Sequence, residues 1–227
     1  MSVAVDRARP HTLARTRPPE VAVREPWSKR AFDSALATIG LVISWPVWCV
    51  VAAAIWIDSG LPIFYTQERV GRQGRVFRVW KFRSMIANAE RWSGARQACQ
   101  GDPRITPVGR WLRSTALDEL PQLWNIVRGD MSFVGPRALR PGEIEVSGDG
   151  RHERLEDVPG FEGRTAVRPG LTGVAQIYAP RDVPRRQKFR YDRVYITHQT
   201  FGLDLRLMLL SVWITLRGSW ETRGPKF

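Results

Sequence analysis

The chain has 227 residues, which is enough for one domain with a hydrophobic core and short of the usual length of two. Its 35 Lys and Arg against 22 Asp and Glu give a net charge of +13, which calls for an anionic partner such as a membrane surface, a phosphorylated substrate or nucleic acid. Its two cysteines, Cys49 and Cys99, lie far apart, and this spacing argues against a disulfide framework and against a cysteine-ligated zinc site.

The first part of the chain changes abruptly in composition. Residues 1–26 are rich in Arg and Pro and have no apolar periodicity, so they predict a disordered basic tail. An uncharged run from Ala35 to Ile57 follows, and it exceeds the roughly 20 apolar residues that a helix needs to cross a bilayer. The sequence therefore predicts a membrane helix over residues 27–58.

The charges beside this helix bear on its topology. Both flanks carry more Lys and Arg than Asp and Glu, and basic flanks tend to stay in the cytoplasm. Pro46, near the middle of the apolar run, removes a helical hydrogen bond, and Ser44 is placed to take up part of the freed bonding. We expect a re-entrant helix that breaks at Pro46 and enters and leaves through the cytoplasmic leaflet. A single proline-kinked transmembrane anchor is the alternative.

Residues 59–220 predict an α+β domain built from short elements. The stretch "IFYTQERVGRQGRVFRVWKFRSM" predicts two strands around a turn at Gly71–Gly74. A helical pattern over residues 87–98 and a basic, turn-rich stretch over residues 102–113 follow. Residues 138–168 predict a long loop with at most one short element.

The end of this domain carries a second apolar segment. The run between Arg206 and Arg217 is too short to span a bilayer, and it predicts an amphipathic helix in the membrane interface. Trp213 and Trp220 are candidate anchors at that interface. Residues 221–227 form a short tail.

Two adjacent carboxylates, Asp118 and Glu119, stand within "STALDELPQLWNIVRGDMSFVGPR". Acidic residues commonly cap helices, and Pro121 places the start of a helix close to Asp118. Basic residues also surround the pair in sequence, and a carboxylate held among guanidinium groups can attack phosphorus or hold Mg²⁺ against a phosphate. Helix capping and catalysis both fit the residues alone. The basic residues in question are Lys81, Arg83, Arg104, Arg110, Arg113, Arg128 and Arg137.

Four motifs in this order resemble the bacterial sugar transferases, the monotopic polyprenyl-phosphate phosphoglycosyl transferases. They are "KFRSM" (Lys81–Met85), "DPRITPVGRWLR" (Asp102–Arg113), "LDELPQLWNIVRGDMSFVGPR" (Leu117–Arg137) and "PGLTGVAQ" (Pro169–Gln176). The resemblance extends from about residue 29 to residue 216. That family has a re-entrant helix broken at a proline, which agrees with the pattern around Pro46.

The resemblance implies a two-step reaction. Asp118 would attack the sugar-bearing phosphate of a UDP-sugar and release UMP, and undecaprenyl phosphate would then take the sugar phosphate from the aspartate. Glu119 would position groups or handle protons, and Asp118 with the diphosphate would hold Mg²⁺, with Mn²⁺ as a substitute. Arg113 matches a phosphate-binding arginine of the family. Lys81 and Arg137 match further basic positions near the phosphates, and Arg83 is a candidate of the same kind.

The resemblance also implies a setting and leaves some choices open. It places the protein on the cytoplasmic face of the bacterial inner membrane, among its lipids, in exopolysaccharide, lipopolysaccharide or other surface-glycan synthesis, and it allows a homodimer. The chain departs from the family pattern at Ala138, in the long loop after it, and over Ile177–Arg186, so the sugar is not fixed. We expect a hexose such as glucose or galactose, with an N-acetylated sugar as the alternative. A membrane-anchored nucleic-acid-binding protein lacks a recognition motif here, and a non-catalytic scaffold would use the carboxylates only as caps.

Overall fold

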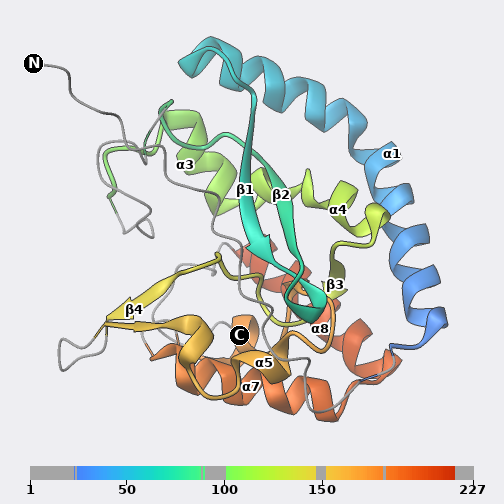
Figure 1. Ribbon diagram of the computed structural model, residues 1–227. Coiled ribbons are helices and arrows are strands. Elements are labelled where there is room, and N and C mark those ends of the chain that lie inside the picture. Colours follow the sequence, from blue (N-terminus) through green and yellow to red (C-terminus); the bar gives the residue numbers. More distant parts are fainter. Residues whose placement is uncertain are drawn as a thin grey trace, which may run out of the picture.

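The computed structural model describes residue 23 and residues 25–87, 89, 101–146, 152–180 and 183–217. Both helices and short strands occur in this part of the chain, so the fold is a mixed one, as predicted (Figure 1). Most of the tail 1–26, most of the helical segment 87–98, Trp220 and the tail 221–227 lie outside the described residues. In chain order the elements, with η marking 3₁₀ turns, are α1 (Trp27–Ser59), β1 (Phe64–Val70), η1 (Arg72–Gly74), β2 (Val76–Phe82), α3 (Pro107–Ser114), η2 (Leu117–Glu119), α4 (Gln122–Arg128), β3 (Ser132–Val134), β4 (Ile144–Val146), β5 (His152–Arg154), η3 (Leu155–Asp157), α5 (Phe161–Arg164), β6 (Gly170–Thr172), α6 (Val174–Tyr178), α7 (Arg185–Thr197) and α8 (Phe201–Arg217).

Helix α1 has 33 residues and continues through Pro46. The predicted break is therefore a bend, which Figure 1 shows as the blue helix turns over the end of the molecule. A proline costs a helix one hydrogen bond and a clash with the preceding turn, so bending is the expected response. Ser44 lies in that turn, where its hydroxyl accepts a hydrogen bond from Trp48 Nε1 at 3.1 Å.

The outer side of α1 is apolar and exposed. Only 11% of its most apolar stretch is buried, and the helix is long and apolar enough to cross a membrane by length and composition. Helix α8 confirms the helix predicted near the end of the chain. Exposed large apolar side chains line it as well. On α1 they include Ile39, Val42, Ile43, Trp45, Val50, Trp56 and Ile57, and on α8 Phe201, Leu209, Val212, Trp213 and Leu216.

The inner side of α1 packs on α4. Arg30 donates from Nη1 to the Ile126 carbonyl at 2.5 Å and from Nη2 to the Val127 carbonyl at 2.6 Å, which satisfies the last carbonyls of α4. A Cβ on Gly40 would lie 3.2 Å from Leu123 Cδ1, so a glycine there lets the two helices approach closely. Helix α1 is thus fixed directly to the helix that follows the carboxylate pair.

A buried polar network ties the start of α1 to α8. Lys29 Nζ lies 2.7 Å from Asp204 Oδ2, and Asp204 Oδ1 accepts a hydrogen bond from the Tyr195 hydroxyl at 2.8 Å. The same hydroxyl oxygen lies 3.0 Å from the Val134 carbonyl, so its single hydrogen is shared between that carbonyl and Asp204. All these side chains are buried, so their charges and hydrogen bonds must be matched within the protein. The network joins α1, α7 and α8 to strand β3.

The predicted hairpin is confirmed. Strands β1 and β2 pair antiparallel from Phe64↔Phe82 to Val70↔Val76, around the turn that begins at Gly71. The basic stretch after residue 101 is not mainly turn, because α3 occupies Pro107–Ser114. Its proline stands at the start of the helix, where a missing N–H costs nothing, and Thr106 caps it by accepting from the Gly109 N–H.

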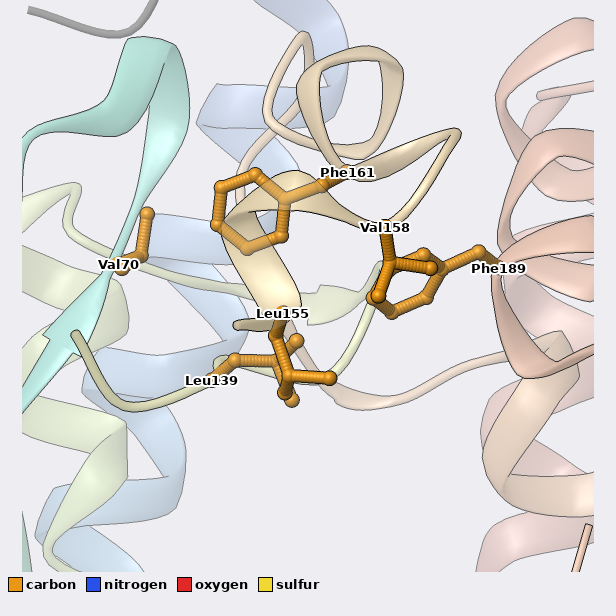
Figure 2. Close-up of a cluster of buried hydrophobic side chains, with 6 residues drawn as sticks. All are labelled: Val70, Leu139, Leu155, Val158, Phe161 and Phe189. Carbon is orange, nitrogen blue, oxygen red and sulfur yellow. The ribbon is translucent and has the colours of Figure 1, made fainter. Parts of the chain in front are cut away.

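The prediction of a long loop over residues 138–168 is wrong. The segment forms the antiparallel pair β4–β5, then η3 and α5. Figure 2 shows the apolar cluster that organises it, in which side chains of this segment pack against β1 and α7. The strands are only three residues long, so they leave no readable alternation in the sequence. The cluster consists of Val70, Leu139, Leu155, Val158, Phe161 and Phe189.

Candidate active site

The carboxylate pair sits in the 3₁₀ turn η2, between α3 and α4. Ala116 begins this turn with a positive φ of 56°, a left-handed conformation that reverses the chain after α3. A helical turn begins at Leu117, close to Asp118 as expected, but it is the 3₁₀ turn η2, and the α-helix α4 follows from Gln122 with Pro121 in the N-cap position. The carboxylates precede α4 instead of capping it. Asp118 is 8% exposed, which is unusual for a carboxylate.

Glu119 forms an ion pair with a lysine from the hairpin. Lys81 Nζ lies 2.5 Å from Glu119 Oε1, with both side chains partly exposed. Asn125 fixes the relative position of the two elements, because its side-chain amide bonds the edge of β2. Its Oδ1 accepts from the Trp80 N–H at 3.0 Å and its Nδ2 donates to the Arg78 carbonyl at 2.8 Å. The amide therefore occupies the place that a third strand would take.

The two carboxylates are electrostatically distinct. Burial raises the pKa of Asp118 to about 6, and Glu119 adds to this rise while Lys81 and Arg113 oppose it. For Glu119, burial also favours a higher pKa, but Lys81, Arg137 and Arg69 outweigh it and hold the pKa at about 2. Two adjacent carboxylates whose pKa values diverge in this way are typical of sites that give them different tasks.

Arg137 is held beside the pair by a glycine clamp. Added Cβ atoms would lie 2.1 Å from the Gly135 nitrogen if placed on Gly170, and 2.3 Å from the Gly135 oxygen if placed on Gly173. The two glycine-containing motifs, "GPR" and "PGLTG", are therefore in direct backbone contact, with Gly135 N–H donating to Thr172 O at 2.9 Å. The glycines are required by this close approach, and they fix the segment that carries Arg137.

A second contact holds the same segment from the other side. Arg164 donates from Nη2 to the Arg137 carbonyl at 2.6 Å, and its Nε lies 3.0 Å from Asp192 Oδ2 in a buried ion pair. The Arg137 side chain itself is exposed and remains available to a ligand. Hydrogen bonds thus hold the backbone at Arg137, while its side chain is exposed.

The structure brings three of the four predicted basic residues to the carboxylates and places the fourth elsewhere. Lys81 and Arg113 act on Asp118, and Lys81 and Arg137 act on Glu119. Arg83 lies instead at the carboxyl end of α1, where its Nη2 donates to the Ser59 and Gly60 carbonyls at 2.8 Å and 2.6 Å. These contacts use only Nη2, whereas Nε and Nη1 of Arg83 are buried with no hydrogen-bond partner among the described residues, so a phosphate-binding role for Arg83 stays a prediction.

Two residues of the site, Asn125 and Arg69, escaped the sequence reasoning. Asn125 is fully buried within the motif Leu117–Arg137, and its polar character within an apolar helix face was the available signal. Arg69 alternates with Gln67 and Tyr65 along β1, which places all three on one face of the strand.

The described part of the chain holds no group of three or more His, Cys, Asp or Glu side chains suited to a metal ion. A cage made by the protein alone is therefore not found there. Magnesium is commonly held by one or two carboxylates together with substrate phosphates and water. Asp118, whose carboxylate is not used as a helix cap, fits that sparser arrangement.

Comparison with known proteins places these features in a family. The sequence model described as bacterial sugar transferase matches residues 24–218. The undecaprenyl-phosphate glucose phosphotransferase of Komagataeibacter xylinus is 39% identical over 191 residues, which cover 81% of this chain and 35% of that protein. The exopolysaccharide production protein PSS of Rhizobium leguminosarum bv. phaseoli is 38% identical over 204 residues, covering 88% of this chain and 98% of its own length.

A third relative differs in its sugar. The UDP-N-acetylgalactosamine-undecaprenyl-phosphate N-acetylgalactosaminephosphotransferase of Aeromonas hydrophila is 35% identical over 193 residues, covering 84% of this chain and 44% of that protein. The match to the family extends over most of the chain, and it includes the carboxylate pair and the glycine clamp. The chain belongs to the bacterial sugar transferase family. It spans less than half the length of the Komagataeibacter and Aeromonas relatives.

Proposed function

We propose that this protein transfers a sugar 1-phosphate from a UDP-sugar to undecaprenyl phosphate, as an early step of surface-glycan synthesis. The observation that carries this proposal is the pair of carboxylates in η2, of which Asp118 is buried and Glu119 is paired with Lys81. The charges of Arg69, Arg113 and Arg137 also act on the pair. The names of the relatives support the same donor and acceptor classes.

Asp118 is the proposed nucleophile. Its carboxylate oxygen attacks the phosphorus that bears the sugar, the bond from that phosphorus to the oxygen of UMP breaks, and UMP leaves with the electron pair. A phosphate oxygen of the lipid acceptor then attacks the same phosphorus, and Asp118 departs as a free carboxylate. Burial of Asp118 and the neighbouring Lys81 and Arg113 support this role, because cations mask the phosphoryl charge that would otherwise repel an anion.

Glu119 has a proposed role in positioning. A carboxylate whose pKa is about 2 stays ionised at neutral pH and is a poor proton carrier. Its 2.5 Å contact with Lys81 supports a role in holding that ammonium group toward the substrate. Of the two functions expected from the sequence, the site favours positioning over proton transfer.

We propose that Asp118 also contributes an oxygen ligand to Mg²⁺, with Mn²⁺ as a substitute. Such an ion, when bound, offsets negative charge on the diphosphate. The protein supplies one carboxylate in this arrangement, and substrate phosphate and water complete the shell.

The proposed topology is re-entrant, with both ends of α1 at the cytoplasmic face of the inner membrane. A straight helix of 33 residues would be about 50 Å long and would place its ends on opposite sides of the bilayer. Both ends of α1 instead contact the rest of the chain, Lys29 through Asp204 and Ser59 through Arg83. The basic flanks, the proline within α1 and the curved course of that helix in Figure 1 support the same topology.

The reaction is tested by a screen of UDP-sugars with undecaprenyl phosphate and Mg²⁺, scored by UMP release and by formation of the lipid product. We expect glucose or galactose donors to react, and an N-acetylated donor is the second candidate because of the Aeromonas relative. EDTA should abolish turnover, and Mg²⁺ or Mn²⁺ should restore it. Turnover by metal-free protein would contradict the metal proposal, and no UMP release from any donor would contradict the reaction.

The topology is tested by cysteine labelling in a variant without Cys49 and Cys99. Ser28→Cys and Leu61→Cys stand at exposed positions beside the two ends of α1. Both should react with a membrane-impermeant reagent only from the cytoplasmic side. Periplasmic labelling at residue 61 would establish a spanning helix.

A further inference from the structure

One face of strand β1 carries a continuous ladder of polar side chains. Gln67 Nε2 donates to the Tyr65 hydroxyl at 3.0 Å, and Arg69 Nη2 donates to Gln67 Oε1 at 2.5 Å. Tyr65 pairs with Lys81 across the hairpin, so Lys81 projects from the same face. The ladder therefore starts beside the Lys81–Glu119 ion pair and ends at Arg69.

Arg69 is anchored to the segment that follows Arg137. Its Nη1 donates to the Ala138 carbonyl at 2.9 Å, and the next N–H of the strand, on Val70, donates to the Leu139 carbonyl at 2.8 Å. The side chains of Val70 and Leu139 belong to the apolar cluster in Figure 2, which fixes both backbones. Arg69 is thus held beside Arg137 by hydrogen bonds and by packing.

The cations at this place outnumber the acids. Burial lowers the pKa of Arg69 to about 10, and the nearby charges of Arg137 and Arg140 add to this effect. The acids that oppose them are Glu143 and Glu119. Both are already bonded to other cations, Glu143 to Arg185 at 3.1 Å and Glu119 to Lys81 at 2.5 Å. Guanidinium groups gathered in this way bind phosphate well, because each offers several donors in a fixed plane.

The geometry of in-line displacement at phosphorus indicates which phosphate groups these arginines would bind. The attacking and leaving oxygens lie on opposite sides of the phosphorus. In the proposed reaction, the oxygen of UMP leaves from the side opposite Asp118, and the oxygen of the lipid phosphate later attacks from that same side. A single set of cations beyond the dyad would therefore serve two phosphate groups in turn.

We propose that Arg69 and Arg137 form one phosphate subsite on the Glu119 side of the dyad, used first by the phosphate of UMP and then by the phosphate of the lipid acceptor. This inference rests on the proposed function for its order of events. The subsite itself is a claim about phosphate binding, and it can be measured without turnover.

The direct test compares the binding of UMP and of uridine, which lacks the phosphate, to purified full-length protein. Arg69→Gln should weaken UMP binding about 10- to 100-fold, the range expected for one charged hydrogen-bond partner, and should leave uridine binding unchanged. Arg69→Lys keeps the charge, so its affinity for UMP should lie between that of Arg69→Gln and that of the unchanged protein. Arg128→Gln, which removes an exposed arginine on α4, is the matched control and should leave UMP binding unchanged. Equal UMP affinity in the Arg69→Gln variant and the unchanged protein would overturn the subsite.

The sharing of the subsite has its own test. Undecaprenyl phosphate in detergent micelles should displace bound UMP competitively, while undecaprenol, which lacks the phosphate, should not. In single-turnover experiments, Arg69→Gln should slow both UMP release and transfer from the loaded protein to the lipid. Simultaneous binding of UMP and undecaprenyl phosphate, or slowing of only one half-reaction, would overturn the sharing. Loss of UMP affinity in Arg69→Gln without any turnover in the unchanged protein would refute the reaction and leave the phosphate subsite standing.

Discussion

Asn125→Ala should destabilise the protein because one side chain closes the edge of the catalytic hairpin. The substitution leaves two backbone groups on β2 without partners, the Trp80 N–H and the Arg78 carbonyl. A buried unpaired polar group costs roughly 1–3 kcal/mol, and because both hydrogen bonds are only partly buried we take the low end for each, so the free energy of unfolding should fall by about 2 kcal/mol. At roughly 2–4 °C for each kcal/mol, the melting temperature should fall by roughly 4–8 °C.

The assay is the apparent melting temperature in one detergent at one scan rate, followed through tryptophan fluorescence. Arg128→Gln is the control from the same helix, since its pair with Asp130 is exposed and spans 3.5 Å, and it should shift the melting temperature little. At temperatures below its melting transition, Asn125→Ala should still turn over more slowly than the unchanged protein. The reason is that Trp80, which loses its partner, directly precedes Lys81, the residue paired with Glu119. A melting temperature within about 2 °C of the unchanged protein would refute the reasoning.

Two further predictions concern the clamp and the nucleophile. Gly170→Ala should lose most activity and stability, because its Cβ would lie 2.1 Å from the Gly135 nitrogen. In the control Gly163→Ala, the added Cβ meets nothing within 4 Å, so this variant should behave as the unchanged protein. Expression level and melting temperature are measured for both variants, and equal tolerance of the two substitutions would contradict the clamp. The attacking Asp118 must be ionised, so kcat/KM should fall as the pH drops through about 6, the raised pKa of this residue. Arg113→Gln removes a charge that lowers this pKa, so the acid limb of its pH profile should move to higher pH, and a shift to lower pH would contradict the assignment.

The sequence was sufficient for features whose signal is local. The uncharged run around Pro46 predicted a long membrane-type helix, and the glycines at residues 71 and 74 predicted the hairpin turn. The carboxylate pair stood out because its basic neighbours were adjacent in sequence. The family motifs then indicated which of those neighbours to expect at the site.

Features built from distant parts of the chain were not predictable in the same way. The elements within residues 138–168 depend on Val70 and Phe189, which lie on either side of that segment in the sequence. Asn125 has its partners on β2, and Arg69 has one at Ala138, so neither residue shows its role in its own stretch. The sequence of helix α3 resembled a turn because it contains Pro107 and Gly109. The proline stands at the start of the helix, and the glycine is required because a Cβ there would lie 2.0 Å from the Ser84 oxygen.

The central claim is that Asp118 becomes covalently attached to the sugar phosphate. The protein is incubated with a reactive UDP-sugar and Mg²⁺ without lipid acceptor, quenched, digested and examined by mass spectrometry beside Asp118→Asn, which keeps nearly the same shape. We predict a sugar-phosphate adduct on the peptide that contains Asp118, its loss on addition of undecaprenyl phosphate, and no adduct with turnover lowered by several orders of magnitude in the Asn variant. Near-normal UMP release by Asp118→Asn, or an adduct on another residue, would contradict the account.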